Sequence, residues 1–168
     1  MPGKLRCDKL TLDSPDFVIG CVESLMDIAG DNSNLHRLFV SDDGCHFRLS
    51  SGQPAIDDAG WYIIYDGRQF PIYVGTSVNL NKRLNTNYGS RDNFKNPDRL
   101  SDGIRNFIKV HAMKESLGEL TVLIITETDF CNRTNIDPPL SKLDRENIEK
   151  VISIFRCLFK IMAVPVCT

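Results

Sequence analysis

The sequence predicts a mixed α/β (α+β) fold, in which a small three-stranded mixed or antiparallel sheet is flanked by helices. Three observations lead to this prediction. Residues 120–126 are apolar on both faces, which is typical of a central strand. Two short aromatic and β-branched runs, 61–65 and 70–74, predict a hairpin. Amphipathic stretches before and after these runs predict the helices.

The N-terminal part reads as a helix followed by a hairpin. Ser14 and Pro15 are typical of a helix start and Gly30 of a helix end, and the residues between them repeat with helical spacing. Alternating apolar residues around Asp43-Gly44 predict a hairpin at 36–50. Because 51–59 has no periodicity, we expect a connector there, with residues 1–57 as an extension and 58–168 as the main domain.

The central hairpin determines what the chain could do. Four polar residues, 66–69, separate its two runs, and a symmetric loop of that length would place Tyr62 directly opposite Tyr73. Pro71 cannot donate to a strand ladder, so we expect its nitrogen to point away from the partner strand or to lie at a sheet edge. Gly75-Thr76-Ser77 is expected to break the strand, and Ser77 to cap a helix over 78–86 with Arg83 at the border of its buried side.

The second half of the chain predicts an exposed loop at 85–101 and an amphipathic helix at 104–116. After the central strand we expect a loop over 128–139. Ser141 then begins the last helix, with Asp144 completing its capping box and the end near Met162.

Composition limits the classes of function. The chain has 168 residues, of which 42% are hydrophobic and 25% charged, as in a soluble globular protein. Six scattered cysteines and no long apolar run favour a reduced, cytoplasmic protein with no membrane segment. The net charge is −2, but residues 80–115 carry eight basic and four acidic side chains, which modestly favours a polyanionic partner.

Phosphodiester hydrolysis needs groups of the kind that this chain offers in Tyr62, Tyr73, Arg83 and the carboxylates of the last helix. Arg supplies a permanent forked cation, a carboxylate holds a divalent metal, and a tyrosine acts as base only where positive charge lowers its pKa. Taken alone, two tyrosines in a hairpin are more often simply packed.

The stretch from Gly60 to Arg83 resembles the GIY-YIG nuclease family. Gly60-Trp61-Tyr62 matches the first signature, with Trp61 in place of a small aliphatic residue, and Tyr73-Val74-Gly75 matches the second. Arg83 falls where the family has its catalytic arginine, and the resemblance covers about residues 58–160. It implies metal-dependent hydrolysis of DNA, with Tyr62 as proton acceptor, Tyr73 positioning water or phosphate, and Arg83 on the phosphate.

The metal ligand is less clearly marked. Glu149, between Ile148 and Ile152, fits the family pattern best, whereas a helical wheel places Asp144 rather than Glu146 or Glu149 toward the apolar face. We rank Glu149 first, then Glu146, then Asp144, with Mg²⁺ or Mn²⁺ as the ion. Tyr88 is an auxiliary catalytic candidate, and five basic residues are candidates for DNA contacts: Lys82, Arg91, Lys95, Arg99 and Arg105.

The resulting hypothesis is an endonuclease of the restriction or phage stand-alone type. One such site cuts one strand, so double-strand cleavage would require a homodimer or successive nicks. The alternative is a catalytically degenerate member of the family that binds nucleic acid or a protein without cutting.

Overall fold

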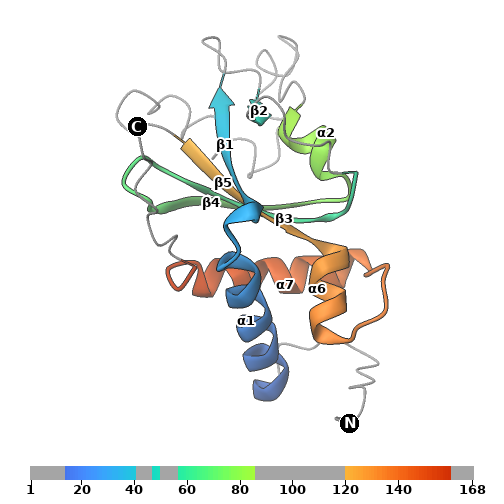
Figure 1. The fold of residues 1–168 in the computed structure, drawn as a ribbon. Coiled ribbons are helices and arrows are strands. Elements are labelled where there is room, and N and C mark those ends of the chain that lie inside the picture. The colour runs from blue at the N-terminus through green and yellow to red at the C-terminus, as the bar shows by residue number, and fades with distance from the viewer. Residues whose placement is uncertain (1–13, 41–46, 50–56, 86–119, 160–168) are drawn as a thin grey trace, which may run out of the picture.

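The computed structural model describes residues 14–40, 47–49, 57–85 and 120–159 (Figure 1). They form a five-stranded sheet in the order β2-β1-β5-β3-β4, in which every neighbouring pair is antiparallel. The strands are β1 (Leu35–Val40), β2 (Phe47–Leu49), β3 (Gly60–Tyr65), β4 (Pro71–Ser77) and β5 (Leu120–Thr126). The α-helices are α1 (Pro15–Ala29), α2 (Leu80–Asn85), α6 (Glu127–Thr134) and α7 (Lys142–Phe155).

The mixed α/β class is confirmed, but the predicted sheet was too small. β1 pairs with β5, so the N-terminal hairpin extends the central sheet instead of standing apart from it. Leu38 illustrates the continuity, because it faces Leu120 on β5 and Leu49 on β2.

Helices cover both faces of the sheet (Figure 1). One face packs against α1, α6 and α7 and receives Trp61, Ile63 and Tyr65. The other face lies against α2 and receives Tyr62 and Ile64. Because side chains alternate along a strand, β3 contributes to both cores, and all six of its residues are buried. The expectation of a two-faced central strand at 120–126 is also confirmed.

The predicted start of α1 is confirmed. Ser14 caps the helix by accepting a hydrogen bond from the backbone N–H of Phe17, and Pro15 occupies the first helical position. Cys21, Leu25 and Ile28 form its buried stripe, which lies in the same core as Trp61.

The predicted register of the central hairpin is wrong by two positions. Tyr62 pairs with Gly75 and Ile64 pairs with Tyr73, with an irregularity between Ile64 and Tyr65. The turn is asymmetric because the carboxylate of Asp66 accepts hydrogen bonds from the N–H groups of Arg68 and Phe70.

The strand also runs further than predicted. Gly75, Thr76 and Ser77 continue β4 because they pair with Tyr62, Trp61 and Gly60 of β3. The helix therefore starts later, at Leu80. Its cap is Asn79, whose side chain accepts from the N–H of Lys82, and Ser77 instead bonds to the backbone of Asn79.

Two predictions after β5 need correction. Part of the expected loop at 128–139 is the helix α6, because Thr126 caps it through the N–H of Asp129 and Phe130 and Cys131 supply a buried side. The capping box of Ser141 and Asp144 is confirmed, but α7 ends at Phe155 and continues only as a turn to Phe159.

The loop predicted at 85–101 starts too early, because Asn85 is the last residue of α2, and the rest of that loop lies outside the described residues. The predicted helix at 104–116 and the Asp43-Gly44 turn also lie outside them. Within the described part of the chain, no helix has the length and apolar character needed to cross a membrane.

Candidate functional site

Tyr62 and Tyr73 meet in spite of the shifted register. Residues two apart on a strand share a face, so Tyr73 lies diagonally across from Tyr62. Their rings stack with centroids 5.9 Å apart and planes 28° from parallel. Tyr62 is only 1% exposed, whereas Tyr73 is half-buried.

Gly75 makes room for this stack. It is the pairing partner of Tyr62, and a Cβ atom added to Gly75 would lie 2.5 Å from both Cζ and the hydroxyl oxygen of Tyr62 and 2.8 Å from Cε1 of Tyr73. A side chain at this position would therefore occupy the space of the two rings. Gly60 is required for a comparable reason, because its added Cβ would lie 2.1 Å from the backbone oxygen of Ile125.

Arg83 lies close enough to Tyr73 and Glu149 to affect both electrostatically. Its side chain is half-buried on α2, which follows directly after β4 and is held by a hydrogen bond from the N–H of Leu80 to the backbone oxygen of Asp58. Burial raises the pKa of Tyr73 and of Glu149 and is the largest effect on each. The positive charge of Arg83 lowers both pKa values by a smaller amount.

Burial is the largest influence on Tyr73 and raises the pKa of its phenol above the ordinary value. A hydrogen bond with Tyr62 and the charge of Arg83 act in the opposite direction, while Glu149 adds to the rise. Tyr73 therefore keeps its proton near neutral pH and is suited to donating a hydrogen bond.

One flank of α7 carries four charged residues. Successive helical residues are about 100° apart, so Lys142, Arg145, Glu146 and Glu149 fall on one side, next to the buried stripe of Ile148 and Ile152. This flank faces the edge strand, because Lys142, Arg145 and Glu146 line a cavity together with residues of β4. The helical wheel, which placed Asp144 and not Glu146 or Glu149 toward the apolar face, therefore did not predict that Glu146 faces β4.

Burial also raises the pKa of the Glu149 carboxyl, and the negative charge of Glu146 raises it further, while Arg83 lowers it. Glu146 forms an ion pair of 3.7 Å with Lys142. Asp144 is used as a cap: its carboxylate accepts from the N–H and hydroxyl of Ser141. Of the three candidate ligands, Glu149 and Glu146 lie near one another and Asp144 serves the helix start.

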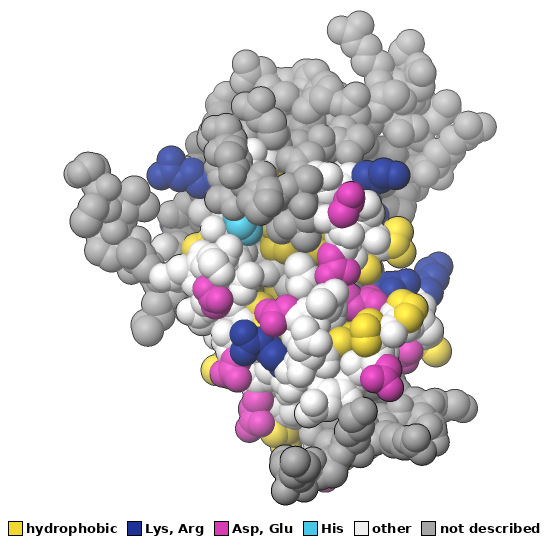
Figure 2. Space-filling view, turned by 45° about the vertical axis from the view of Figure 1, so that its right-hand side comes forward, with side chains coloured by type: hydrophobic (Ala, Val, Ile, Leu, Met, Phe, Trp, Pro, Cys, Tyr) yellow, Lys and Arg dark blue, Asp and Glu magenta, His cyan; other side chains and the backbone are white. Residues whose placement is uncertain are grey.

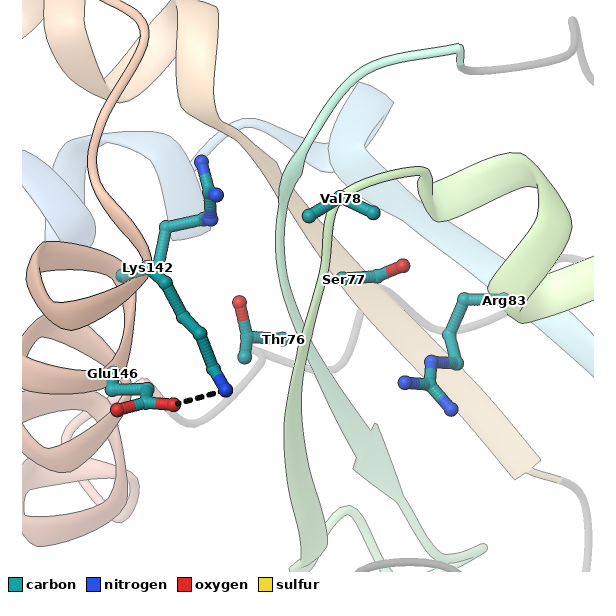
Figure 3. Close-up of a pocket in the computed structure, with 7 residues that line it drawn as sticks. Thr76, Ser77, Val78, Arg83, Lys142 and Glu146 are labelled. Carbon is teal, nitrogen blue, oxygen red and sulfur yellow. Dashed lines mark ion pairs between the residues drawn. The ribbon is translucent and has the colours of Figure 1, made fainter.

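A cavity of about 280 Å³ lies beside this flank (Figure 3). Arg83 approaches from α2 on one side of β4, and Lys142 and Glu146 approach from α7 on the other. Sequence reasoning missed most of its lining, although Lys142 and Arg145 stand four residues before Glu146 and Glu149, a spacing that places such pairs together on a helix. The lining consists of Thr76, Ser77, Val78, Arg83, Lys142, Arg145 and Glu146.

The hydroxyls in this lining are already engaged within the protein. Thr76 donates to the backbone oxygen of Gly60, and Ser77 donates to that of Asn79. Of the three cationic side chains, Arg145 is held by Glu127 and is only 15% exposed, whereas Lys142 is 88% exposed and pairs with Glu146. With Glu146 as the one acidic residue in the lining, an anionic group fits better than a cationic one.

Glu146 and Glu149 lie close together next to the cavity and are suited to binding a divalent cation. Its positive charge would offset the effects of burial and of the Glu146 charge, which both raise the pKa of Glu149. In the described part of the chain, no cluster of three or more His, Cys, Asp or Glu side chains is arranged to hold a metal. Mg²⁺ commonly uses only one or two protein carboxylates, with water and substrate phosphate completing its shell.

Of the auxiliary catalytic residue and the five basic residues predicted to contact DNA, the structure describes Lys82 alone. Lys82 is exposed on α2, while Tyr88, Arg91, Lys95, Arg99 and Arg105 lie outside the described residues. On the face in Figure 2, the described basic side chains are interspersed with acidic ones instead of forming one patch. Most of the basic segment on which the polyanion hypothesis rests is thus not described.

Comparison of the chain with protein-family models, curated proteins and solved structures finds no match.

Proposed function

We propose that the protein is a metal-dependent endonuclease of the GIY-YIG type that hydrolyses phosphodiester bonds in DNA. The observation that carries the proposal is the stacking of Tyr62 on Tyr73, together with the electrostatic effect of Arg83 and Glu149 on Tyr73. The tyrosine rings stack, and Tyr73 and Glu149 both feel the charge of Arg83. This is the set of residues that the resemblance selects from the sequence.

In this proposal Arg83 binds the phosphate that is cut. Its guanidinium stays charged at any working pH and stabilises the extra negative charge of the transition state. Tyr73, which keeps its proton, donates a hydrogen bond to a phosphate oxygen or to the attacking water. Tyr62 is the deeper of the pair, and its buried position favours a role in holding Tyr73 over direct contact with DNA. The role of Tyr62 as proton acceptor stays a prediction.

Glu149, assisted by Glu146, would hold Mg²⁺ or Mn²⁺, which supplies a Lewis acid for the phosphate when bound. The cationic cavity supports a place for the DNA backbone beside these carboxylates, because Lys142 is 88% exposed at its side chain and can reach a phosphate.

A second candidate is a related domain that binds nucleic acid or protein without cutting. It is favoured by the same burial that leaves Tyr62 1% exposed and raises the pKa of Tyr73, since neither property suits a proton acceptor.

The test is cleavage of supercoiled plasmid with Mg²⁺ or Mn²⁺ by the wild-type protein and by Arg83→Ala. We expect nicked or linear product from the wild type and at least a hundredfold slower cleavage by the variant, the usual effect of losing one donor to transition-state charge. Arg133→Ala is the matched control, because Arg133 pairs with Asp129 on the surface of α6, away from the site.

Equal cleavage by the wild type and Arg83→Ala would contradict the proposal. Metal-independent DNA binding without any cleavage by the wild type would favour the second candidate. The absence of both activities on duplex and branched DNA would count against a nucleic-acid function.

A further inference from the structure

Three side chains beneath the sheet tie α7 to the rest of the fold. The indole N–H of Trp61 donates to the backbone oxygen of Arg145 at 3.0 Å. The guanidinium of Arg145 donates through Nη1 to Glu127 at 2.9 Å and to the backbone oxygen of Leu140 at 2.8 Å. The other carboxylate oxygen of Glu127 accepts from the N–H of Leu140 at 2.7 Å. We call Trp61, Glu127, Leu140 and Arg145 the α7 clamp.

The side chains of the clamp are mostly buried. The side chains of Arg145 and Glu127 are 15% and 5% exposed, and Trp61 is fully buried, with its ring edge-on to Phe130 at 5.2 Å. A buried ion pair contributes little net stability compared with apolar packing, but it tolerates few geometries, because each partner loses much when its contacts are broken. The clamp is therefore better suited to fixing an orientation than to adding stability.

The orientation that it fixes is that of the carboxylates. Arg145 directly precedes Glu146 and stands one turn before Glu149 on the same flank of α7. Trp61 directly precedes Tyr62 on β3, and consecutive strand residues point to opposite faces. The segment Trp61-Tyr62 thus reaches α7 on one face of the sheet and the tyrosine stack on the other.

We infer that Trp61 is a positioning residue, which sets the rotation of α7 through the carbonyl of Arg145 and so fixes where Glu149 and Glu146 lie along the edge strand β4. The indole N–H makes this contact, and an aliphatic side chain at position 61 would have no donor for it. The inference rests on the proposed function for its catalytic meaning, but the connection between Trp61 and α7 stands on its own contacts.

The experiment compares Trp61→Phe, which keeps an aromatic ring and removes the indole N–H, with Phe130→Leu, which disturbs the same core without touching α7 through a hydrogen bond. Two measurements are made at a temperature where circular dichroism shows both variants folded. Hydrogen exchange is followed at the amides of α7, and Mn²⁺ affinity is measured by calorimetry. Plasmid cleavage at varied Mg²⁺ concentration is a third measurement.

For Trp61→Phe we expect faster exchange across residues 145–152, and about tenfold weaker metal affinity with a matching rise in half-saturating Mg²⁺, as is usual when the support of a metal ligand is lost. The KM for DNA should change little, since Arg83 is untouched. Phe130→Leu should lower the unfolding temperature while leaving metal affinity and α7 exchange near wild type.

Unchanged α7 exchange in Trp61→Phe, or an equal effect in Phe130→Leu, would overturn the inference. A wild-type protein that neither binds Mn²⁺ nor cuts DNA overturns the proposed function, and hydrogen exchange then still decides whether Trp61 orients α7.

Discussion

Gly75 is the single residue on which the tyrosine stack most directly depends. Its pairing partner is Tyr62, and an added Cβ would lie within 2.8 Å of both tyrosine rings. Sequence reasoning treated Gly75 as a strand breaker, whereas the structure uses it as an opening within a continuous strand. Backbone pairing to β3 overrides the local tendency of Gly-Thr-Ser to end a strand.

Gly75→Ala is therefore expected to be destabilising and to separate the rings. We predict a loss of about 1–3 kcal/mol in the free energy of unfolding, the usual cost of overpacking, together with strongly reduced cleavage. Urea denaturation followed by fluorescence measures the first effect. The control is Gly20→Ala, where a Cβ meets nothing within 4 Å on helix α1 and should raise stability by about 0.5–1 kcal/mol. Wild-type stability in Gly75→Ala would show that the rings tolerate a methyl group there.

Helix α7 shows why some parts of the site follow from sequence and others do not. The cap at Ser141 and the apolar repeat at Ile148 and Ile152 are local signals, and both were read correctly. The direction of the charged flank is not local, because it depends on how α7 packs against the edge strand β4. The register of the hairpin failed for a different reason: the hydrogen bonds of Asp66 in the turn are local, but the apolar pattern does not reveal them.

The two glutamates of this helix, Glu146 and Glu149, should differ in importance. Burial is the main cause of the raised pKa of Glu149. The side chain of Glu146, by contrast, is 43% exposed and pairs with Lys142. We predict that Glu149→Gln abolishes metal-dependent cleavage, while Glu146→Gln lowers it about tenfold or less. Cleavage rates over a range of Mg²⁺ concentrations provide the comparison. Full activity in Glu149→Gln together with loss in Glu146→Gln would reverse the assignment.

The five-stranded sheet joins the N-terminal part to the candidate site more closely than the sequence suggested. β1 pairs with β5 along four residue pairs, and β5 pairs in turn with β3, which carries Tyr62. Leu25 and Ile28 of α1 are fully buried in the core that contains Trp61 and Ile148. The boundary predicted at residues 57 and 58 therefore divides a shared core and a shared sheet.

Removal of residues 1–57 should consequently prevent stable folding. Burial of each large aliphatic side chain contributes about 1.5–3 kcal/mol, and a domain is typically stable by only about 5–15 kcal/mol, so the loss of α1 and β1 is comparable with the total. We predict that the 58–168 fragment gives no cooperative thermal transition by circular dichroism. The control fragment 14–168 keeps Ser14 and every described contact, and should melt cooperatively. A cooperative transition in 58–168, with cleavage intact, would instead establish residues 1–57 as a dispensable extension.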